Sequence, residues 1–145
     1  MKPPLGLESL GLASGPAFGP DMRKNLGIIR LLKVGLPVSA FGRLQERMGL
    51  SAREIAMRLN IPPRTLARRK KEGRLPPGES ERLFRYAFLF DRAEEVLGDL
   101  EAARQWFKTP AKALGGKTPL DYADTEIGAR EVEDLLGRLE EGVFS

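Results

Sequence analysis

A short stretch of basic and hydroxyl side chains is the part of the sequence best suited to binding a charged partner. Its members are Arg64, Thr65, Arg68, Arg69, Lys70 and Lys71. In a helix that turns about 100° per residue, Arg64, Arg68 and Lys71 share one face. Arginine can donate two hydrogen bonds to one guanine in the DNA major groove, whereas lysine more often contacts phosphate. The stretch therefore predicts a DNA-binding helix, and a merely solvated basic helix is the alternative.

Within this stretch we expect two kinds of contact with DNA. Such a helix would enter the major groove by its N-terminal half, and we expect Arg64, Thr65 and Arg68 to read bases. The remaining cations are expected on phosphates, which position a protein without specifying a sequence; they are Arg69, Lys70, Lys71 and Arg74. Arg69 departs from the usual pattern, because helix-turn-helix units mostly carry an apolar residue at that place.

The preceding residues have the pattern of a helix-turn-helix unit. Ser51 and Glu54 form a capping box, in which each side chain bonds the backbone amide of the other, and this starts a first helix. Ala56 is small enough to lie where two helices cross closely. Asn60 tolerates the left-handed conformation of a tight turn, and Pro63 can open the second helix.

The remaining apolar periodicity is helical as well, and we expect an all-α fold. Further helices are expected over 22–34 with Asp21 as cap, from Pro37 to Met48, over 79–97, after a cap at Asp99, after a cap at Thr118, and over 128–141. Three segments are predicted: a flexible arm over 1–20, a helix-turn-helix domain over 21–75 and a C-terminal domain over 76–145. The break at Pro76-Pro77 marks the boundary between the two domains.

The charge distribution supports two surfaces with different partners. The chain has 24 Lys and Arg against 20 Asp and Glu, a net charge of +4. Residues 41–75 carry ten basic and three acidic side chains, a net +7, whereas 91–145 carry seven basic and thirteen acidic ones, a net −6. A basic middle and an acidic end are typical of a chain that binds nucleic acid with one half and a protein with the other.

Several function classes are excluded or disfavoured by what the composition lacks. The chain has no Cys and no His. Thiolate metal sites and Ser–His or Cys–His catalysis are therefore excluded, and we expect no enzyme, no metal and no cofactor. The run from Gly115 to Thr118 lacks the first glycine and the preceding strand of a phosphate loop. No apolar run is long enough for a transmembrane helix, and the N-terminus does not resemble a signal peptide, so we expect a cytoplasmic protein.

The order and spacing of several motifs resemble those of one known family. The motifs are Leu50-Ser51, Ile61-Pro62-Pro63-Arg64-Thr65-Leu66-Ala67-Arg68-Arg69-Lys70, Glu79-Ser80-Glu81-Arg82-Leu83, Trp106, Leu114-Gly115-Gly116-Lys117-Thr118-Pro119-Leu120-Asp121, Thr125-Glu126-Ile127-Gly128 and Gly142-Val143-Phe144. Taken together, over about residues 37–145, they closely resemble the Xre/MbcA/ParS-type antitoxins. The resemblance implies an Xre-like helix-turn-helix bundle followed by a small helical toxin-binding domain.

The resemblance also implies partners. Members of that family belong to bacterial type II toxin–antitoxin systems, and their usual partner is a RES-domain toxin that depletes NAD. The antitoxin would bind the toxin directly, repress its own operon by binding operator DNA, and form homodimers and hetero-oligomers with the toxin.

By the same resemblance, the last helix and the tail are expected at the toxin surface. The candidate contacts are Glu133, Leu136, Glu140, Val143, Phe144 and Ser145. A solvated acidic helix face is the alternative for the charged members. Two other functions stay open from the residues: a stand-alone dimeric helix-turn-helix regulator without a toxin, and an enzyme that uses paired carboxylates.

Overall fold

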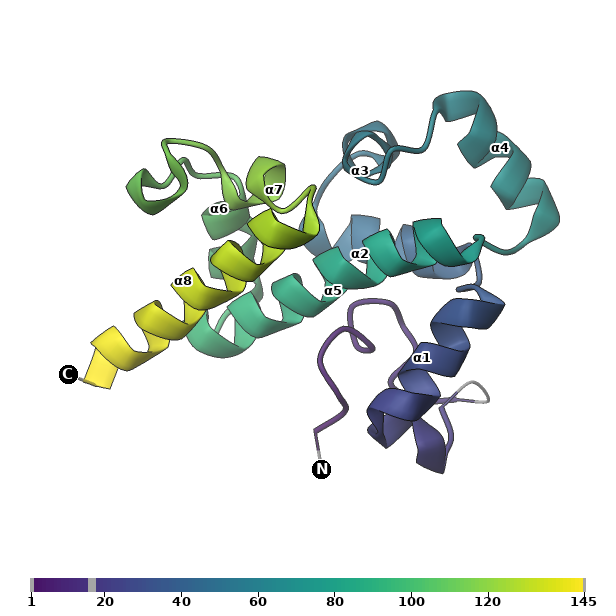
Figure 1. The fold of residues 1–145 in the computed structure, drawn as a ribbon, viewed down its shortest axis with the longest axis horizontal. Coiled ribbons are helices and arrows are strands. Elements are labelled where there is room, and N and C mark those ends of the chain that lie inside the picture. The colour runs from purple at the N-terminus through teal and green to yellow at the C-terminus, as the bar shows by residue number, and fades with distance from the viewer. Residues whose placement is uncertain (1, 16–17, 145) are drawn as a thin grey trace.

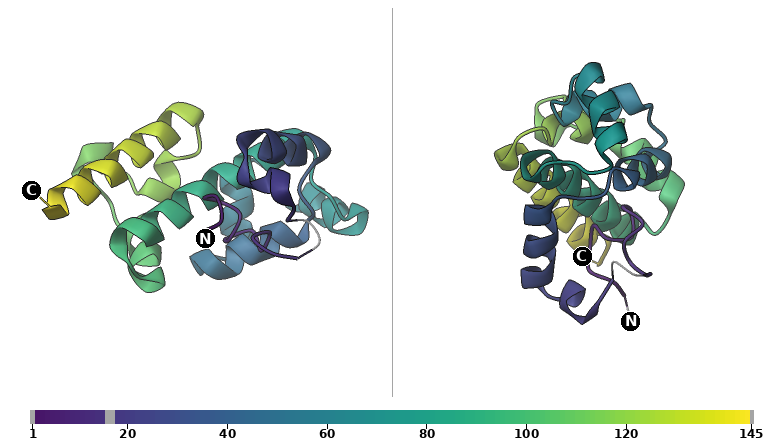
Figure 2. Two further views of the ribbon diagram at one scale, coloured as in Figure 1. Left: turned by 90° about the horizontal axis from the view of Figure 1, so that it is seen from below. Right: turned by 90° about the vertical axis from the view of Figure 1, so that its right-hand side faces the viewer.

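The regular elements of the chain are helices (Figures 1 and 2). The computed structural model describes residues 2–15 and 18–144, with side chains up to Gly142. The helices are α1 (Asn25–Val34), α2 (Ser39–Met48), α3 (Ala52–Arg58), α4 (Pro63–Glu72), α5 (Pro77–Leu97), α6 (Leu100–Phe107), α7 (Pro119–Tyr122) and α8 (Glu126–Phe144), with 3-10 turns at Pro20–Arg23 and Lys112–Leu114. Over the described ranges no strand forms, and one isolated antiparallel bridge joins Pro37 to Arg74. The all-α prediction is confirmed.

Helix α5 is the central helix of the fold. Its buried side chains include Leu83, Tyr86, Ala87, Phe90 and Ala93, which recur at the three- and four-residue spacing of a helix face. Helices α1 and α2 pack against α5, and so do α6 and α8. Figure 1 shows α8 lying along α5, with α4 at the far end of the molecule from the C-terminus. The helix-turn-helix half and the C-terminal half therefore share one continuous helix.

Most helix ends follow the local sequence rules. The Ser51 hydroxyl accepts from the Glu54 amide at 3.1 Å while the Glu54 carboxylate accepts from the Ser51 amide at 2.9 Å, so the predicted capping box is confirmed. Asn60 adopts the left-handed conformation with φ 59°. Asp99 and Thr118 cap α6 and α7 as predicted.

The start of α1 was predicted wrongly. Asp21 caps no helix, because it belongs to the 3-10 turn before α1, and α1 begins at Asn25 without a side-chain cap. The turn folds back over Gly27, where a Cβ would lie only 2.0 Å from the Asp21 carbonyl oxygen. The missing side chain of Gly27 therefore permits this compact start.

The N-terminal residues are packed, which differs from the flexible arm expected over 1–20. Leu7 is fully buried and Leu10 is 1% exposed. The buried Asp91 carboxylate of α5 accepts hydrogen bonds from the amide of Gly6 at 2.7 Å, the amide of Ser9 at 3.4 Å and the Ser9 hydroxyl. Burial raises the pKa of Asp91, and these three hydrogen bonds oppose that rise. The segment lacks helical periodicity because it folds as turns, so pattern analysis did not find its buried leucines.

The Asp91→Ala variant is expected to release this segment. It leaves the amides of Gly6 and Ser9 without their acceptor, and we expect the free energy of unfolding to fall by about 2–3 kcal/mol. Urea unfolding measures the loss, and limited proteolysis before residue 13 measures the release. Asp134→Ala, at an exposed position of α8, is the control and should change stability by less than about 0.5 kcal/mol. Unchanged stability and no new cleavage in Asp91→Ala would contradict this role.

Candidate functional site

The helix-turn-helix unit consists of α3, a short turn and α4. The turn closes where the amide of Ile61 donates to the carbonyl of Ala56 at 2.9 Å, directly after the left-handed Asn60. Ala56 is 4% exposed and Leu66 of α4 is 7% exposed. The sequence thus produces the predicted unit, and α4 projects from the rest of the molecule (Figure 1).

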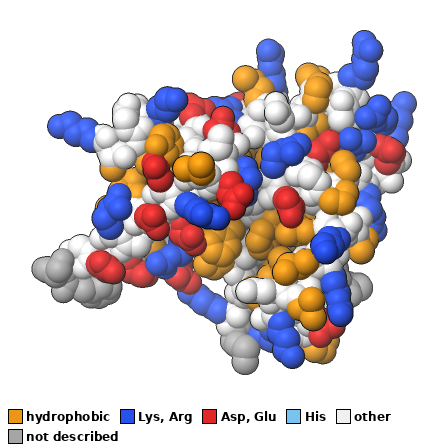
Figure 3. All heavy atoms as spheres, in the orientation of Figure 1, with side chains coloured by type: hydrophobic (Ala, Val, Ile, Leu, Met, Phe, Trp, Pro, Cys, Tyr) orange, Lys and Arg blue, Asp and Glu red, His pale blue; other side chains and the backbone are white. Residues whose placement is uncertain are grey.

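The outer face of α4 is strongly basic. Arg64, Arg68, Lys70 and Lys71 are exposed, and Thr65 is half-buried. Among the described residues, Arg64, Lys70 and Lys71 form no ion pair, and Arg68 has only a long 3.9 Å contact with Glu72. Lys and Arg side chains gather over this end of the molecule in Figure 3. These cations can therefore reach a polyanion without breaking strong internal contacts.

Two of the side chains expected to contact phosphate bond within the protein instead. The Arg69 guanidinium turns inward and forms a two-point ion pair with Glu79 of α5, at 3.0 and 2.9 Å. The Arg74 guanidinium donates to the carbonyl of Gly35 at 2.7 Å. Both guanidinium groups are engaged within the protein, so we leave Arg69 and Arg74 out of the set that faces DNA.

Helix α8 carries several acidic side chains, and in Figure 3 acidic and basic side chains alternate over this part of the surface. Glu133 is half-buried and makes no ion pair with the described residues. Glu140 pairs with Arg92 of α5 at 2.8 and 3.0 Å, and this contact lowers the pKa of Glu140 and raises that of Arg92. The Glu140 side chain is still 43% exposed, so it lies at the surface although its charge is already compensated.

The other expected toxin contacts are placed differently. Leu136 is fully buried within the core, so we remove it from the candidate contact set. Ser145 and the side chains of Val143 and Phe144 lie outside the described part of the structure.

The structure also shows a groove between the two halves that sequence reasoning missed. The groove has a volume of about 670 Å³ and is lined by α3, α7 and the start of α8. Met57 and Ile127 line it with exposed fractions of 67% and 74%, and Arg58 pairs with Asp121 across it at 2.7 Å. The walls come from segments far apart in the chain, so no local pattern could have indicated the groove.

The described residues include neither a cluster of metal-ligating side chains nor a membrane-spanning helix. They include no group of three acidic side chains arranged to hold a metal ion. None of their helices is both long enough and apolar enough to cross a membrane.

Comparisons with known proteins agree with this two-part arrangement. Residues 27–87 match the antitoxin Xre-like helix-turn-helix domain, and residues 92–142 match the antitoxin Xre/MbcA/ParS C-terminal toxin-binding domain. The two matches adjoin inside α5, which supplies one helix to both.

Individual relatives extend over most of the chain. An antitoxin Xre of Yersinia enterocolitica is 39% identical over 120 residues, which cover 81% of each chain. An antitoxin Xre of Photorhabdus laumondii is 35% identical, over 79% of each chain. A Prs ADP-ribosylating antitoxin of a Sphingobium species is 24% identical, over 81% of this chain and 80% of its own length. The chain therefore belongs to the Xre/MbcA/ParS family of type II antitoxins, a non-enzymatic family that combines an Xre-like helix-turn-helix domain with a C-terminal toxin-binding domain.

Proposed function

We propose that this antitoxin neutralises a RES-domain toxin by direct binding and represses its own operon by binding operator DNA. The observation that carries the DNA half is the set of exposed cations on α4, which make no close ion pair with the described residues. Arg64, Thr65 and Arg68 read bases in the major groove, and Lys70 and Lys71 contact phosphates. The protein acts in the bacterial cytoplasm, where both partners are reached without crossing a membrane.

A homodimer is part of this proposal. One recognition helix contacts only a few base pairs, and helix-turn-helix proteins gain specificity by placing two such helices about 34–36 Å apart on one side of the DNA. Larger hetero-oligomers form when the toxin joins the dimer.

The toxin half of the proposal rests on the end of the chain. Glu133 supplies negative charge at the surface of α8. Glu140 is also exposed there, and it can add to that charge if a partner displaces Arg92. Val143, Phe144 and Ser145 supply the contact beyond them. Acidic side chains complement a basic cleft such as one that binds NAD, and they increase the association rate more than the final affinity. An apolar anchor such as Phe144 contributes the affinity instead, because buried aromatic groups dominate most interfaces.

The toxin half is tested by co-expression with the toxin encoded beside the antitoxin gene. Phe144→Ala is expected to weaken toxin binding by about 2 kcal/mol and to restore toxicity, while Glu133→Ala mainly slows association. Glu81→Ala, at an exposed position of α5, is the control and should still neutralise the toxin. Affinity and association rate are measured with the purified proteins.

Continued toxicity despite soluble wild-type antitoxin would contradict neutralisation. If the protein then still bound its promoter, it would instead be a stand-alone regulator. Unchanged toxin affinity in Phe144→Ala would show that the tail is not part of the toxin interface.

A further inference from the structure

Helix α4 has little apolar anchorage for a helix that must present base-reading side chains. Of its ten residues, only Leu66 is buried. Its packing contacts are mainly with the short α3, not with α5. One buried side chain leaves a helix free to rotate and tilt about that point, so some other contact must hold the orientation of α4.

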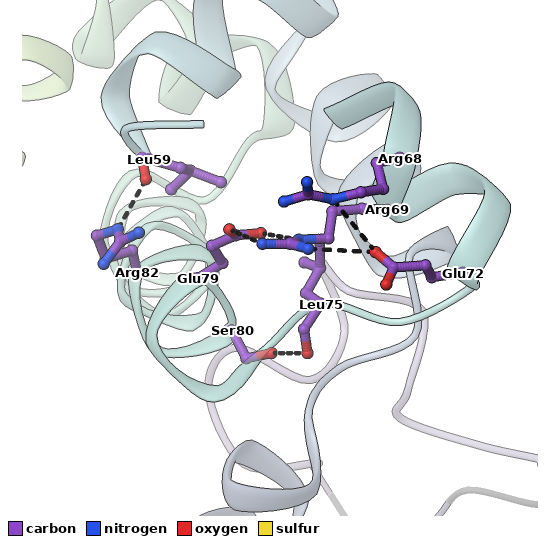
Figure 4. Close-up of polar contacts among 8 residues, drawn as sticks. All are labelled: Leu59, Arg68, Arg69, Glu72, Leu75, Glu79, Ser80 and Arg82. Atoms are coloured by element: carbon purple, nitrogen blue, oxygen red, sulfur yellow. Dashed lines mark hydrogen bonds and ion pairs between the residues drawn. The ribbon is translucent and has the colours of Figure 1, made fainter. Parts of the chain in front are cut away.

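The Arg69–Glu79 pair supplies that second point. Nε of Arg69 donates to Oε1 of Glu79 at 3.0 Å, and Nη2 donates to Oε2 at 2.9 Å (Figure 4). The two side chains are only 16% and 10% exposed. A two-point contact between a planar guanidinium and a carboxylate restricts rotation as well as distance. Glu79 also lies in the first turn of α5, where the helix dipole favours a negative charge.

Neighbouring side chains of α5 hold the segments on both sides of α4. The Ser80 hydroxyl donates to the carbonyl of Leu75, just after α4, at 3.1 Å and accepts from the amide of Leu36 at 2.8 Å. Nε of Arg82 donates to the carbonyl of Leu59, just before α4, at 2.7 Å. Figure 4 shows these side chains close together at one end of α5. The same helix end thus holds the turn before α4, the link after it and α4 itself.

The two anchors of α4 lie on one face, and Arg64, Arg68 and Lys71 lie on the other. Leu66 and Arg69 are three residues apart and point into the protein. At about 100° per residue, Arg64 and Lys71 lie nearly opposite them. A rotation of α4 about its axis would therefore move the base-reading side chains directly.

We propose that Glu79 is a positioning residue for DNA recognition: by holding Arg69 at two points, it sets the rotation of α4 and so the register of Arg64 and Arg68 on the bases. The proposal rests on DNA binding by α4, as proposed above. It assigns Arg69 a role inside the protein, not on phosphate. It also predicts that the pair governs discrimination between operator and other DNA more than it governs general attraction to DNA.

The test compares Glu79→Gln and Arg69→Lys with the wild type in gel shifts at fixed salt, on operator and on unrelated DNA. Glutamine cannot hold the guanidinium with two charge-assisted hydrogen bonds. Lysine keeps the positive charge of Arg69 but lacks the planar guanidinium that forms two parallel hydrogen bonds. Both variants are expected to lower the ratio of operator to non-specific affinity by about tenfold, with the non-specific salt dependence unchanged. The control is Glu94→Gln, which removes a similar partly buried pair between α5 and Arg47 of α2, and it should leave the ratio unchanged.

A phosphate role for Arg69 predicts the opposite pattern. Glu79→Gln would then free Arg69, strengthen binding to all DNA alike and leave the ratio unchanged, while Arg69→Lys would behave like the wild type. That result would overturn the proposal.

A second measurement tests the effect of the Arg69–Glu79 pair on α4 in the absence of DNA. Amide hydrogen exchange in the free protein should become faster in α4, but not in α2, when Glu79 is replaced by Gln. Suppose that exchange in α4 is faster in Glu79→Gln but the wild type binds no DNA. That result would refute the proposed DNA-binding function while supporting the role of the Arg69–Glu79 pair in holding α4. Unchanged exchange in α4 would show that the Arg69–Glu79 pair does not hold this helix, whatever the protein binds.

Discussion

Replacing both Arg64 and Arg68 by Ala should abolish most operator discrimination while the protein stays folded. Both side chains are exposed on the face of α4 opposite its packing side, so their removal costs little stability. Each well-placed arginine contributes about 1–3 kcal/mol of preference for the correct base. The weak 3.9 Å contact between Arg68 and Glu72 is exposed and does not oppose binding appreciably. Gel shifts on operator and on scrambled DNA at one salt concentration measure the loss.

Lys71→Ala is the matched comparison for this double variant. It lies on the same face of α4 but is assigned to phosphate, so it should weaken binding to all sequences alike. The slope of log affinity against log salt should fall in magnitude by about 0.9, the value for one phosphate contact. Full operator affinity in the double arginine variant would show that α4 does not bind in the major groove, whatever the effect of Lys71→Ala.

The Leu136→Ala variant is expected to destabilise the fold by about 2–5 kcal/mol. Leu136 is fully buried in α8, and its truncation leaves a cavity in the core that α8 shares with α5. Toxin affinity, measured below the unfolding transition and corrected for the folded fraction, should not change. Urea unfolding followed by circular dichroism gives the stability.

Leu139→Ala provides the control on the same helix. Leu139 is 37% exposed, so its truncation removes less buried surface and should cost clearly less stability than Leu136→Ala. A Leu136→Ala variant with full stability and weakened toxin binding would restore Leu136 to the interface.

The elements of the fold could be predicted from sequence because their signals are local. The capping box of Ser51 and Glu54, the left-handed turn at Asn60 and the cap at Thr118 each involve residues within one helical turn of one another. Such contacts form in the same way wherever the segment lies, so the residue types predict them. The cations of α4 could also be found, because their spacing along one helix determines which of them share a face.

Whether an individual side chain is buried, bonded or part of a groove depends on segments that are far apart in the sequence, and no local pattern connects them. Ser9 and Asp91, which hold the N-terminal segment, are 82 positions apart in the sequence, and the whole helix-turn-helix domain lies between them. Leu136 belongs to the apolar face of α8 by its spacing, but only the tertiary packing of α8 shows that it is fully covered. The groove beside Met57 and Ile127 exists because the fold places α3 and the start of α8 on its two sides.

By itself, the sequence determined an all-helical chain with a basic helix-turn-helix unit and an acidic C-terminal half, because composition and periodicity are properties of contiguous residues. Only the tertiary structure decided which charges are available to a partner. Arg68 and Arg69 are adjacent in the sequence and chemically identical, yet one faces solvent and the other is held by Glu79. A charged side chain pairs with a carboxylate that the fold brings within reach, and Glu79, which holds Arg69 at two points, lies on a different helix.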